Sequence, residues 1–152
     1  IAGFPTETDA MHANSLALVE ECDIVMGHVF PYSAKAGTPA ARMPQVPAAA
    51  IKERARRLRD ACARRRQTWL EGLVGTTQRV LAERGGTGHA ENFAPVRLLA
   101  REQADQNRSS RAKSRGAGTE SEVRPSTSLG TNEVVSVLIT SVEGDRLIGV
   151  AA

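Results

Sequence analysis

A long stretch with almost no apolar side chains, from Arg101 to Glu133, divides the second half of this 152-residue chain. It consists mainly of Ser, Arg, Gly, Thr and Glu. Such a segment cannot bury enough apolar surface to offset the entropy that is lost when a chain is ordered. We therefore expect residues 101–133 to be a disordered insertion, and the simplest interpretation is an insertion without a function.

The segments on either side of this insertion predict a small antiparallel β-barrel over residues 76–152. Residues 77–83 alternate as a strand does, 84–88 form a glycine-rich turn, and 89–98 predict a strand that is broken by Pro95. After the insertion, residues 134–142 are strongly β-prone. The turn Glu143-Gly144-Asp145 then leads into a last strand over 146–150. The aromatic content is only 3%, so we expect an aliphatic core.

Residues 1–47 predict a different architecture, a strand–helix–strand unit. Residues 1–3 read as the end of a buried strand, and Thr8 as the N-cap of the helix that follows. Residues 24–30 are apolar and partly β-branched, so they predict a second strand. This order implies a parallel sheet covered by helices, so the fold class is α/β followed by β. The apolar stripe expected on the helix consists of Met11, Ser15, Leu18, Val19 and Cys22.

Residues 48–75 predict a basic connecting helix that is closed by Gly72 and Gly75. Its expected apolar stripe is Ile51, Ala55, Leu58, Cys62 and Trp69. Residues 52–66 hold Lys52 and seven arginines against Glu53 and Asp60, a net charge of +6. So few acids in the segment favour contact with RNA phosphates over the alternative, a solvated helix face. The candidate RNA contacts here are Lys52, Arg54, Arg57, Arg64, Arg65 and Arg66.

The two cysteines, Cys22 and Cys62, are too few for a disulfide-rich scaffold or a cysteine-based metal site. We expect both to be small core residues, in a protein of the reducing cytoplasm. The histidines show no ligand spacing, so no metal site is assigned. No apolar run approaches the roughly 20 residues that span a bilayer. Because the chain opens on Ile1-Ala2-Gly3 without a methionine, we expect it to begin inside a longer protein.

Three segments resemble one family, the radical S-adenosylmethionine (SAM) methylthiotransferases. Residues 1–8, IAGFPTET, resemble the family segment IVGFPGET, and residues 28–40, HVFPYSAKAGTPA, are similar to HVFPYSPRPGTPA. Residues 88–96, GHAENFAPV, look like GYTENYLPV of the C-terminal TRAM domain. The chain departs from the family at Thr6, which replaces a glycine, and at Lys35, which replaces an arginine. Thr at this position fits without strain only where φ is negative.

The resemblance implies the last βα units of a TIM-like radical SAM barrel over residues 1–47, followed by a TRAM barrel. It implies SAM and [4Fe-4S] clusters as cofactors of the parent enzyme, and tRNA as its partner. The cluster-binding CxxxCxxC motif is absent from this chain, which we therefore expect to be inactive alone. By resemblance, the cofactor contacts are Gly3, Phe4, Pro5 and Glu7, and the substrate loop contributes Tyr32, Ser33 and Lys35. Further RNA contacts are expected on the small β-barrel, at Arg79, Asn92, Phe93 and Arg97.

The resemblance favours the subgroup that adds a methylthio group to threonylcarbamoyl-adenosine beside the anticodon of tRNA, because His28 precedes the Val-Phe-Pro-Tyr-Ser segment. We expect a cytoplasmic monomer that does not bind membranes. Two alternatives stay open. One is a non-catalytic RNA-binding fragment, and the other is a methylthiotransferase that acts on an aspartate of a ribosomal protein.

Overall fold

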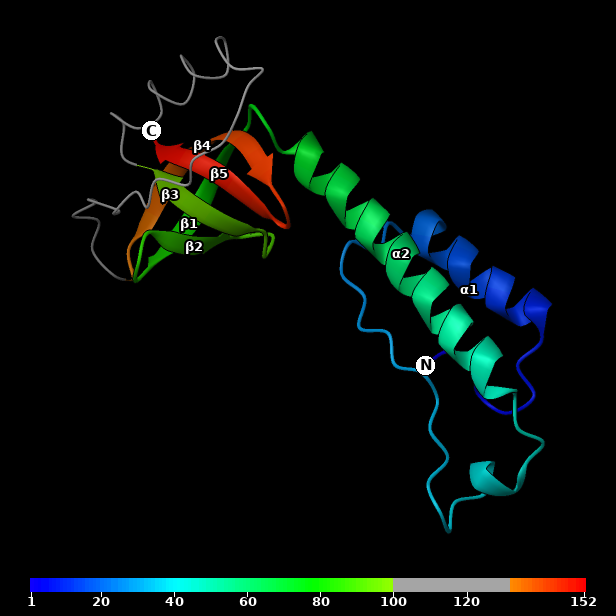
Figure 1. Cartoon of the computed structure of the whole chain (residues 1–152). Helices are drawn as coiled ribbons and strands as arrows, with labels where there is room; N and C mark the ends of the chain where they lie inside the picture. The colour runs from blue at the N-terminus through cyan, green and yellow to red at the C-terminus, as the bar shows by residue number, and fades with distance from the viewer. Residues whose placement is uncertain (100–131) are drawn as a thin grey trace, which may run out of the picture. The chain divides into compact units, whose positions relative to one another are not determined.

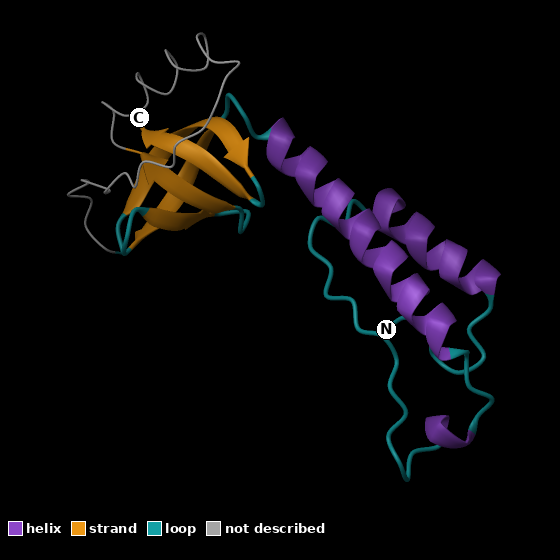
Figure 2. Cartoon of the chain, in the orientation of Figure 1, coloured by secondary structure: helices purple, strands orange, loops and turns teal. Residues whose placement is uncertain are grey.

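The computed structural model describes residues 1–99 and 132–152, which form two compact units, Ile1–Trp69 and Leu70–Ala152 (Figure 1). The first unit is helical and the second is a β-barrel (Figure 2). Most of the insertion that the sequence predicts over 101–133 lies outside the described residues. Its last two residues are described, and they extend the pairing of the barrel: Asn132 N–H donates to Ala82 O, and Ala82 N–H donates to Glu133 O.

The second unit is a closed five-stranded barrel with the strand order β1-β2-β3-β5-β4. The strands are β1 (Thr77–Glu83), β2 (Thr87–Ala90), β3 (Pro95–Leu99), β4 (Val134–Glu143) and β5 (Arg146–Ala151). The sequence predicts β1, β4 and β5 to within one residue, from the alternation along β1, the β-prone residues of β4 and the turn before β5. Because the barrel is closed, each strand has a neighbouring strand on both sides.

Two expectations for the barrel are wrong. The barrel is not wholly antiparallel, because β3 and β5 pair in parallel, with Val96 opposite Leu147. The strand expected over 89–98 is in fact two strands, joined by a turn over 91–94. In this turn Phe93 N–H donates to Ala90 O, and Ala90 N–H donates to Ala94 O. The chain therefore turns before Pro95, which opens β3, where a strand tolerates a residue without an N–H group.

The core of the barrel is aliphatic, as the low aromatic content predicts. Gly88 and Gly149 are buried where strands approach closely, since a Cβ atom at either position would overlap Leu81 O or the Val137 side chain. The buried apolar residues of this unit are Leu70, Val80, Ala82, Ala90, Ala94, Val96, Leu98, Val137, Ile139, Leu147 and Ile148.

The first unit contains α1 (Asp9–Glu21), a short 3-10 helix η1 (Ala40–Arg42) and α2 (Ala48–Gly72). Thr8 is the N-cap of α1, as expected, and its hydroxyl accepts a hydrogen bond from Met11 N–H. The stripe predicted for α1 is largely wrong, because Met11 and Leu18 are more than half exposed whereas His12 and Val19 are buried. The predicted stripe consists mainly of apolar residues, so it does not include the polar side chain of His12. The stripe on α2 is buried or half-buried, as predicted.

The second strand expected over residues 24–30 is also wrong. The segment is extended, but its only strand-like pairing among the described residues is one parallel bridge, between Ala2 and Pro31. Ala2 N–H donates to Phe30 O, and Tyr32 N–H donates to Ala2 O. A run of apolar residues favours a strand, but a sheet needs a neighbour along its whole length. Of the parallel sheet that the sequence predicts, the described residues contain this single bridge.

The two cysteines are less buried than the sequence predicts. Cys22 is exposed at the end of α1, and Cys62 is half-buried on α2. Within the described ranges, none of the helices has the length and apolar character needed to cross a membrane.

Candidate functional site

The turn from Gly3 to Glu7, where the sequence predicts cofactor contacts, is tied together by a buried arginine of α2. Arg54 Nη1 donates to both the main-chain oxygen and Oε2 of Glu7, each at 2.8 Å. The same Glu7 Oε2 accepts the Gly3 N–H at 2.9 Å, and Arg54 Nη2 donates to Asp9 Oδ1 at 2.7 Å. The side chains of Arg54 and Glu7 are each 11% exposed, whereas that of Asp9 is fully exposed. The Glu7 carboxylate therefore links the start of the turn, at Gly3, to Arg54 of α2.

This turn also contains backbone conformations that residues with a side chain rarely adopt. Gly3 has a φ of 76° and Thr6 a φ of 69°. A Cβ atom at Gly3 would overlap the side chain of Ile51 on α2, so this position requires glycine in both conformation and space. Thr6 has no such freedom, and a β-branched residue with positive φ is strained. The condition under which Thr replaces Gly without strain is therefore not met.

His12 lies beside this cluster on α1, and the sequence gave no reason to single it out. Its ring is buried, and among the described residues neither ring nitrogen has a hydrogen-bond partner. Burial lowers the pKa of His12 and outweighs Glu7, which raises it; Arg57 and Arg54 lower it further, and Asp9 raises it. His12 is therefore held neutral in the folded unit.

The predicted cofactor turn and the predicted substrate loop meet at one aromatic pair. Phe4 and Tyr32 pack edge to face, with ring centroids 5.4 Å apart and planes at 74°. Phe4 is 45% exposed, and the buried hydroxyl of Tyr32 has no hydrogen-bond partner among the described residues. The Phe4 ring therefore presents an exposed apolar surface on which an aromatic ligand can stack.

The rest of the predicted substrate loop is exposed to solvent. Ser33 and Lys35 are both exposed, and the Lys35 carbonyl accepts hydrogen bonds from the N–H and hydroxyl groups of Thr38. The Thr38 hydroxyl in turn accepts the N–H of Ala41 in η1. The second half of the loop is thus shaped by Thr38, and among the described residues no hydrogen bond joins the side chain of Ser33 or Lys35 to Phe4 or Tyr32.

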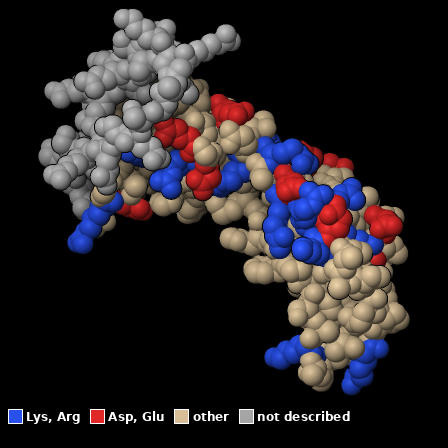
Figure 3. All heavy atoms as spheres, viewed as in Figure 1, with Lys and Arg blue, Asp and Glu red and all other residues tan. Residues whose placement is uncertain are grey.

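The expectation that acids hardly pair the basic residues of α2 is wrong. Arg54 pairs with Glu7 and Asp9, Arg65 pairs with Asp23, and Arg56 bridges Glu53 and Asp60. The acids Glu7, Asp9 and Asp23 lie outside the basic segment in the sequence, so a count within the segment misses them. The hydrogen bond from Arg56 lowers the pKa of the Glu53 carboxyl. Acidic and basic side chains are accordingly intermingled on the face of the helical unit that Figure 3 shows.

Four cations of α2 remain exposed without an ion pair to any described residue. They are Lys52, Arg57, Arg59 and Arg64. Arg57 and Arg64 are two helical turns apart and therefore lie on the same side of α2. Of the predicted RNA contacts on this helix, Lys52, Arg57 and Arg64 are thus the ones whose charge is available to a phosphate.

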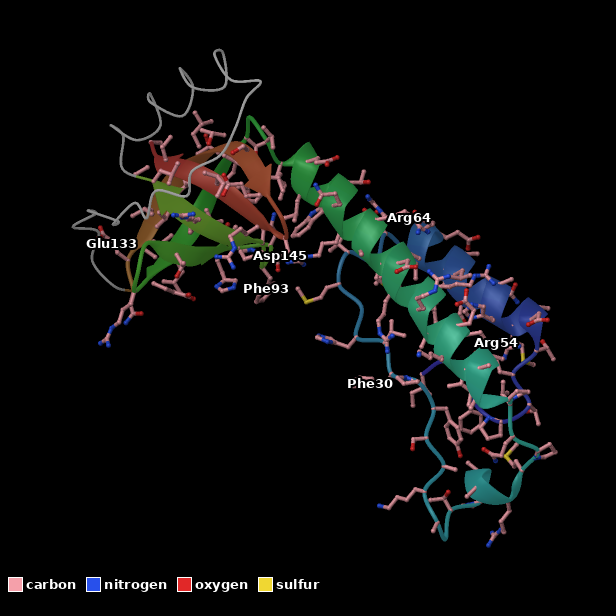
Figure 4. The ribbon with its side chains drawn as sticks, in the orientation of Figure 1. Phe30, Arg54, Arg64, Phe93, Glu133 and Asp145 are labelled. Carbon is pink, nitrogen blue, oxygen red and sulfur yellow. The ribbon has the colours of Figure 1, made fainter. Side chains whose placement is uncertain are left out.

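The barrel presents an exposed aromatic ring next to a mixed set of charges. Phe93 is 75% exposed at the turn between β2 and β3, where it has a φ of 64° (Figure 4). The Asn92 side chain accepts the Ala94 N–H at 3.1 Å, so Asn92 shapes the turn that presents Phe93. Arg79 pairs with Glu91 at 2.6 Å, whereas Arg97 is exposed on β3 without an ion pair in the described part of the chain.

The described residues contain no group of three or more His, Cys, Asp or Glu side chains that could hold a metal ion. An iron–sulfur cluster is held by several cysteine thiolates. The described residues therefore do not fit the [4Fe-4S] clusters that the resemblance implies.

Comparison with known proteins gives a consistent picture. The chain is 46% identical over 98 residues to the threonylcarbamoyladenosine tRNA methylthiotransferase MtaB of Rickettsia prowazekii. The matched segment is 64% of this chain and 23% of that protein. Its homologues are tRNA methylthiotransferases of the radical SAM family. No family model matches the chain.

Two further methylthiotransferases match a shorter part of the chain. Both are called tRNA-2-methylthio-N(6)-dimethylallyladenosine synthase, one from Erythrobacter litoralis and one from Novosphingobium aromaticivorans. They are 42% and 44% identical over 87 residues, which is 57% of this chain and 20% of each protein. The chain thus spans between a fifth and a quarter of the length of these three methylthiotransferases.

Proposed function

We propose that this chain is the C-terminal part of a cytoplasmic tRNA methylthiotransferase, one that adds a methylthio group to threonylcarbamoyl-adenosine beside the anticodon. The observation that carries the proposal is the 46% identity to a methylthiotransferase named for that nucleoside. In this proposal residues 1–47 belong to the catalytic barrel, 48–75 form a basic connecting helix and 76–152 form a TRAM barrel. The small closed barrel of the second unit is compatible with a TRAM domain.

SAM and the iron–sulfur clusters, when bound in the whole enzyme, supply the radical chemistry and the methylthio group. The chain's own residues bind and orient. The half-exposed Phe4 ring offers a stacking surface to the adenosyl part of SAM, and Tyr32 packs against that ring. Gly3 and Pro5 shape the backbone beside them. We expect the chain alone to be inactive, because its two cysteines are too few to hold a cluster.

In the proposal, two surfaces of this chain bind tRNA through different kinds of interaction. On α2, Lys52, Arg57 and Arg64 neutralise phosphates, which positions the RNA without reading its sequence. On the barrel, Phe93 stacks on an unpaired base, and Arg97 of β3 is a phosphate contact. Arg54 is left out of this interface because its guanidinium is buried and occupied by Glu7 and Asp9.

A salt titration of tRNA binding tests the proposal. The variant Arg57→Ala/Arg64→Ala loses two unpaired cations. We expect the slope of the logarithm of the tRNA-binding constant against the logarithm of salt concentration to become less steep by about two units. Arg56→Ala is the matched control. It also removes an exposed arginine from α2, but the charge of Arg56 is already paired with Glu53 and Asp60. Its slope should stay close to that of the unaltered chain.

Three results would contradict the proposal. The first is an unaltered chain that does not bind tRNA, as expected for an enzyme acting on a ribosomal-protein aspartate. The second is a slope that falls equally in the control and in the double variant, because the two unpaired arginines would then have no special part. The third is a salt slope that the double variant leaves unchanged. Circular dichroism of each variant checks that α2 is still folded.

A further inference from the structure

The shape of the Gly3–Glu7 turn depends on contacts from a residue far away in the sequence. Arg54 lies 47 positions from Glu7, yet it binds both the main-chain oxygen and the carboxylate of Glu7. The carboxylate oxygen that it binds is also the acceptor for the Gly3 N–H. One guanidinium and one carboxylate therefore connect the start of the turn, its end and α2.

The turn needs this support because its backbone is strained at Thr6. Glycine adopts the positive φ of Gly3 freely, but a β-branched residue with a φ of 69° persists only where surrounding contacts hold it. Within the turn itself, where every residue is described, the only backbone hydrogen bond runs from Glu7 N–H to Phe4 O. The links to α2 through Arg54, together with the packing of Ile51 over Gly3, supply the rest.

We propose that Arg54 is a positioning residue, which sets the conformation of the Gly3–Glu7 turn and so orients the Phe4 side of the cofactor contact. The inference rests on the proposed function for its cofactor, but the positioning of the turn can be measured without any ligand. The hydrogen bonds of Arg54 go to Glu7 and Asp9, while Phe4 packs on Tyr32, so Arg54 acts on the turn through Glu7. The Asp9 half of its pairing is solvent-exposed and contributes little.

The two contacts that reach the turn come from one nitrogen of the guanidinium. Arg54 uses Nη1 for both Glu7 oxygens, whereas Nη2 binds the exposed Asp9. A lysine keeps the charge and one donor nitrogen but loses the planar fork, so Arg54→Lys should restore part of the turn. An alanine leaves the Glu7 carboxylate buried without its cation, which favours a turn in which Glu7 moves toward water.

Amide hydrogen exchange of the full chain tests the positioning directly. In Arg54→Ala we expect exchange at the Gly3 amide to rise at least tenfold, with Arg54→Lys in between. Amides of the barrel strands, such as Val80, should keep their protection and report that this unit is folded. The matched control is again Arg56→Ala, which removes an exposed arginine two positions away and should leave Gly3 unchanged.

Glu7→Gln keeps the inference testable if Arg54→Ala unfolds the helical unit. Its side-chain oxygen still accepts the Gly3 N–H but lacks the charge that attracts Arg54, so exchange at Gly3 should rise less than in Arg54→Ala. Exchange at Gly3 that is unchanged in Arg54→Ala, or in Glu7→Gln where only that variant folds, overturns the inference. So does a lysine variant that exchanges as fast as the alanine variant.

Titration with SAM separates this inference from the proposed function. If the unaltered chain binds SAM, Arg54→Ala should raise the dissociation constant at least tenfold, and Arg56→Ala should not. Loss of protection at Gly3 without any change in the dissociation constant would overturn the link to the cofactor. If the unaltered chain binds no SAM, the cofactor contact in the proposed function fails, while the exchange data still decide whether Arg54 sets the turn.

Discussion

The two units of this chain are stabilised in different ways. The barrel is closed, and its interior is filled by aliphatic side chains such as Leu147 and Ile139. The helical unit has a single strand-like bridge, and several of its large apolar side chains are exposed, including Ile1 at 76% and Phe30 at 64% (Figure 4). Its contacts between residues far apart in the sequence include ion pairs, above all that of Arg54 with Glu7, beside small buried side chains such as Ala2 and Ala55. Apolar burial thus dominates one unit, and polar contacts have a larger part in the other.

This difference places the functional groups. Closed sheets tolerate exposed residues on their outer face without loss of core, so the barrel can present Phe93 at a turn. The helical unit keeps strained backbone at Thr6 and a buried neutral histidine, features that cost stability and occur often at functional sites. We expect the barrel to be robust to changes in polar residues and the helical unit to be sensitive to them.

The largest effect should come from opening the core of the barrel. Leu147 is fully buried, so Leu147→Ala should lower the free energy of unfolding of this unit by about 3 kcal/mol. Leu138→Ala is the matched control, because Leu138 lies on β4 with 40% of its surface exposed and should cost much less. Denaturant unfolding of both variants measures the difference. Equal losses would mean that the barrel is not held by its interior.

A smaller effect of opposite sign is expected at Thr6. Thr6→Gly should raise the free energy of unfolding of the helical unit by about 1 kcal/mol, because it relieves the strain of a β-branched residue at positive φ. Thr6 is exposed, so little packing is lost. Thr6→Ala keeps a Cβ atom and should gain less. A destabilised glycine variant in thermal unfolding would show that Thr6 is not strained.

The smallest effect is a pH dependence from His12. Its pKa is lowered in the folded state, mainly by burial, so the unfolded chain binds the proton more readily. Stability from this source is fully present above the unfolded pKa of about 6.5 and is lost as the pH falls from there toward the folded pKa. His12→Gln should flatten this part of the stability profile. A profile that is equally steep in both proteins between pH 5 and 7 would exclude His12 as its cause.

The sequence predicts the barrel strands well and the helical unit less well, for a physical reason. Strand alternation and the Gly144 turn are local signals, so β1, β4 and β5 follow from them. Parallel pairing of β3 with β5 depends on closure of the whole sheet, which no local pattern encodes. The extended segment 24–30 carries the residues of a strand, but its pairing depends on neighbours that its own pattern cannot specify.

The candidate site shows the same limit. The motifs point to the segments of Phe4 and Tyr32, and the fold brings these two rings into contact. They say nothing of Arg54, whose role depends on acids 45 and 47 positions away. A count of charges within one helix cannot separate it from Arg57 or Arg64. His12 was missed because a lone histidine on a helix gives no signal until the packing around it is known.

The tRNA titration tests the central claim most directly when it compares the helix with the barrel. The account predicts that Phe93→Ala weakens binding by about 1–3 kcal/mol with little change in the salt slope, because stacking is not an electrostatic contact. Phe93→Tyr, which keeps a ring for stacking, should retain most of the affinity, and Arg57→Ala/Arg64→Ala should lower the slope by about two units. Unchanged affinity in a folded Phe93→Ala variant, together with an unchanged slope in the folded arginine variant, would contradict the assignment of tRNA binding to these two surfaces.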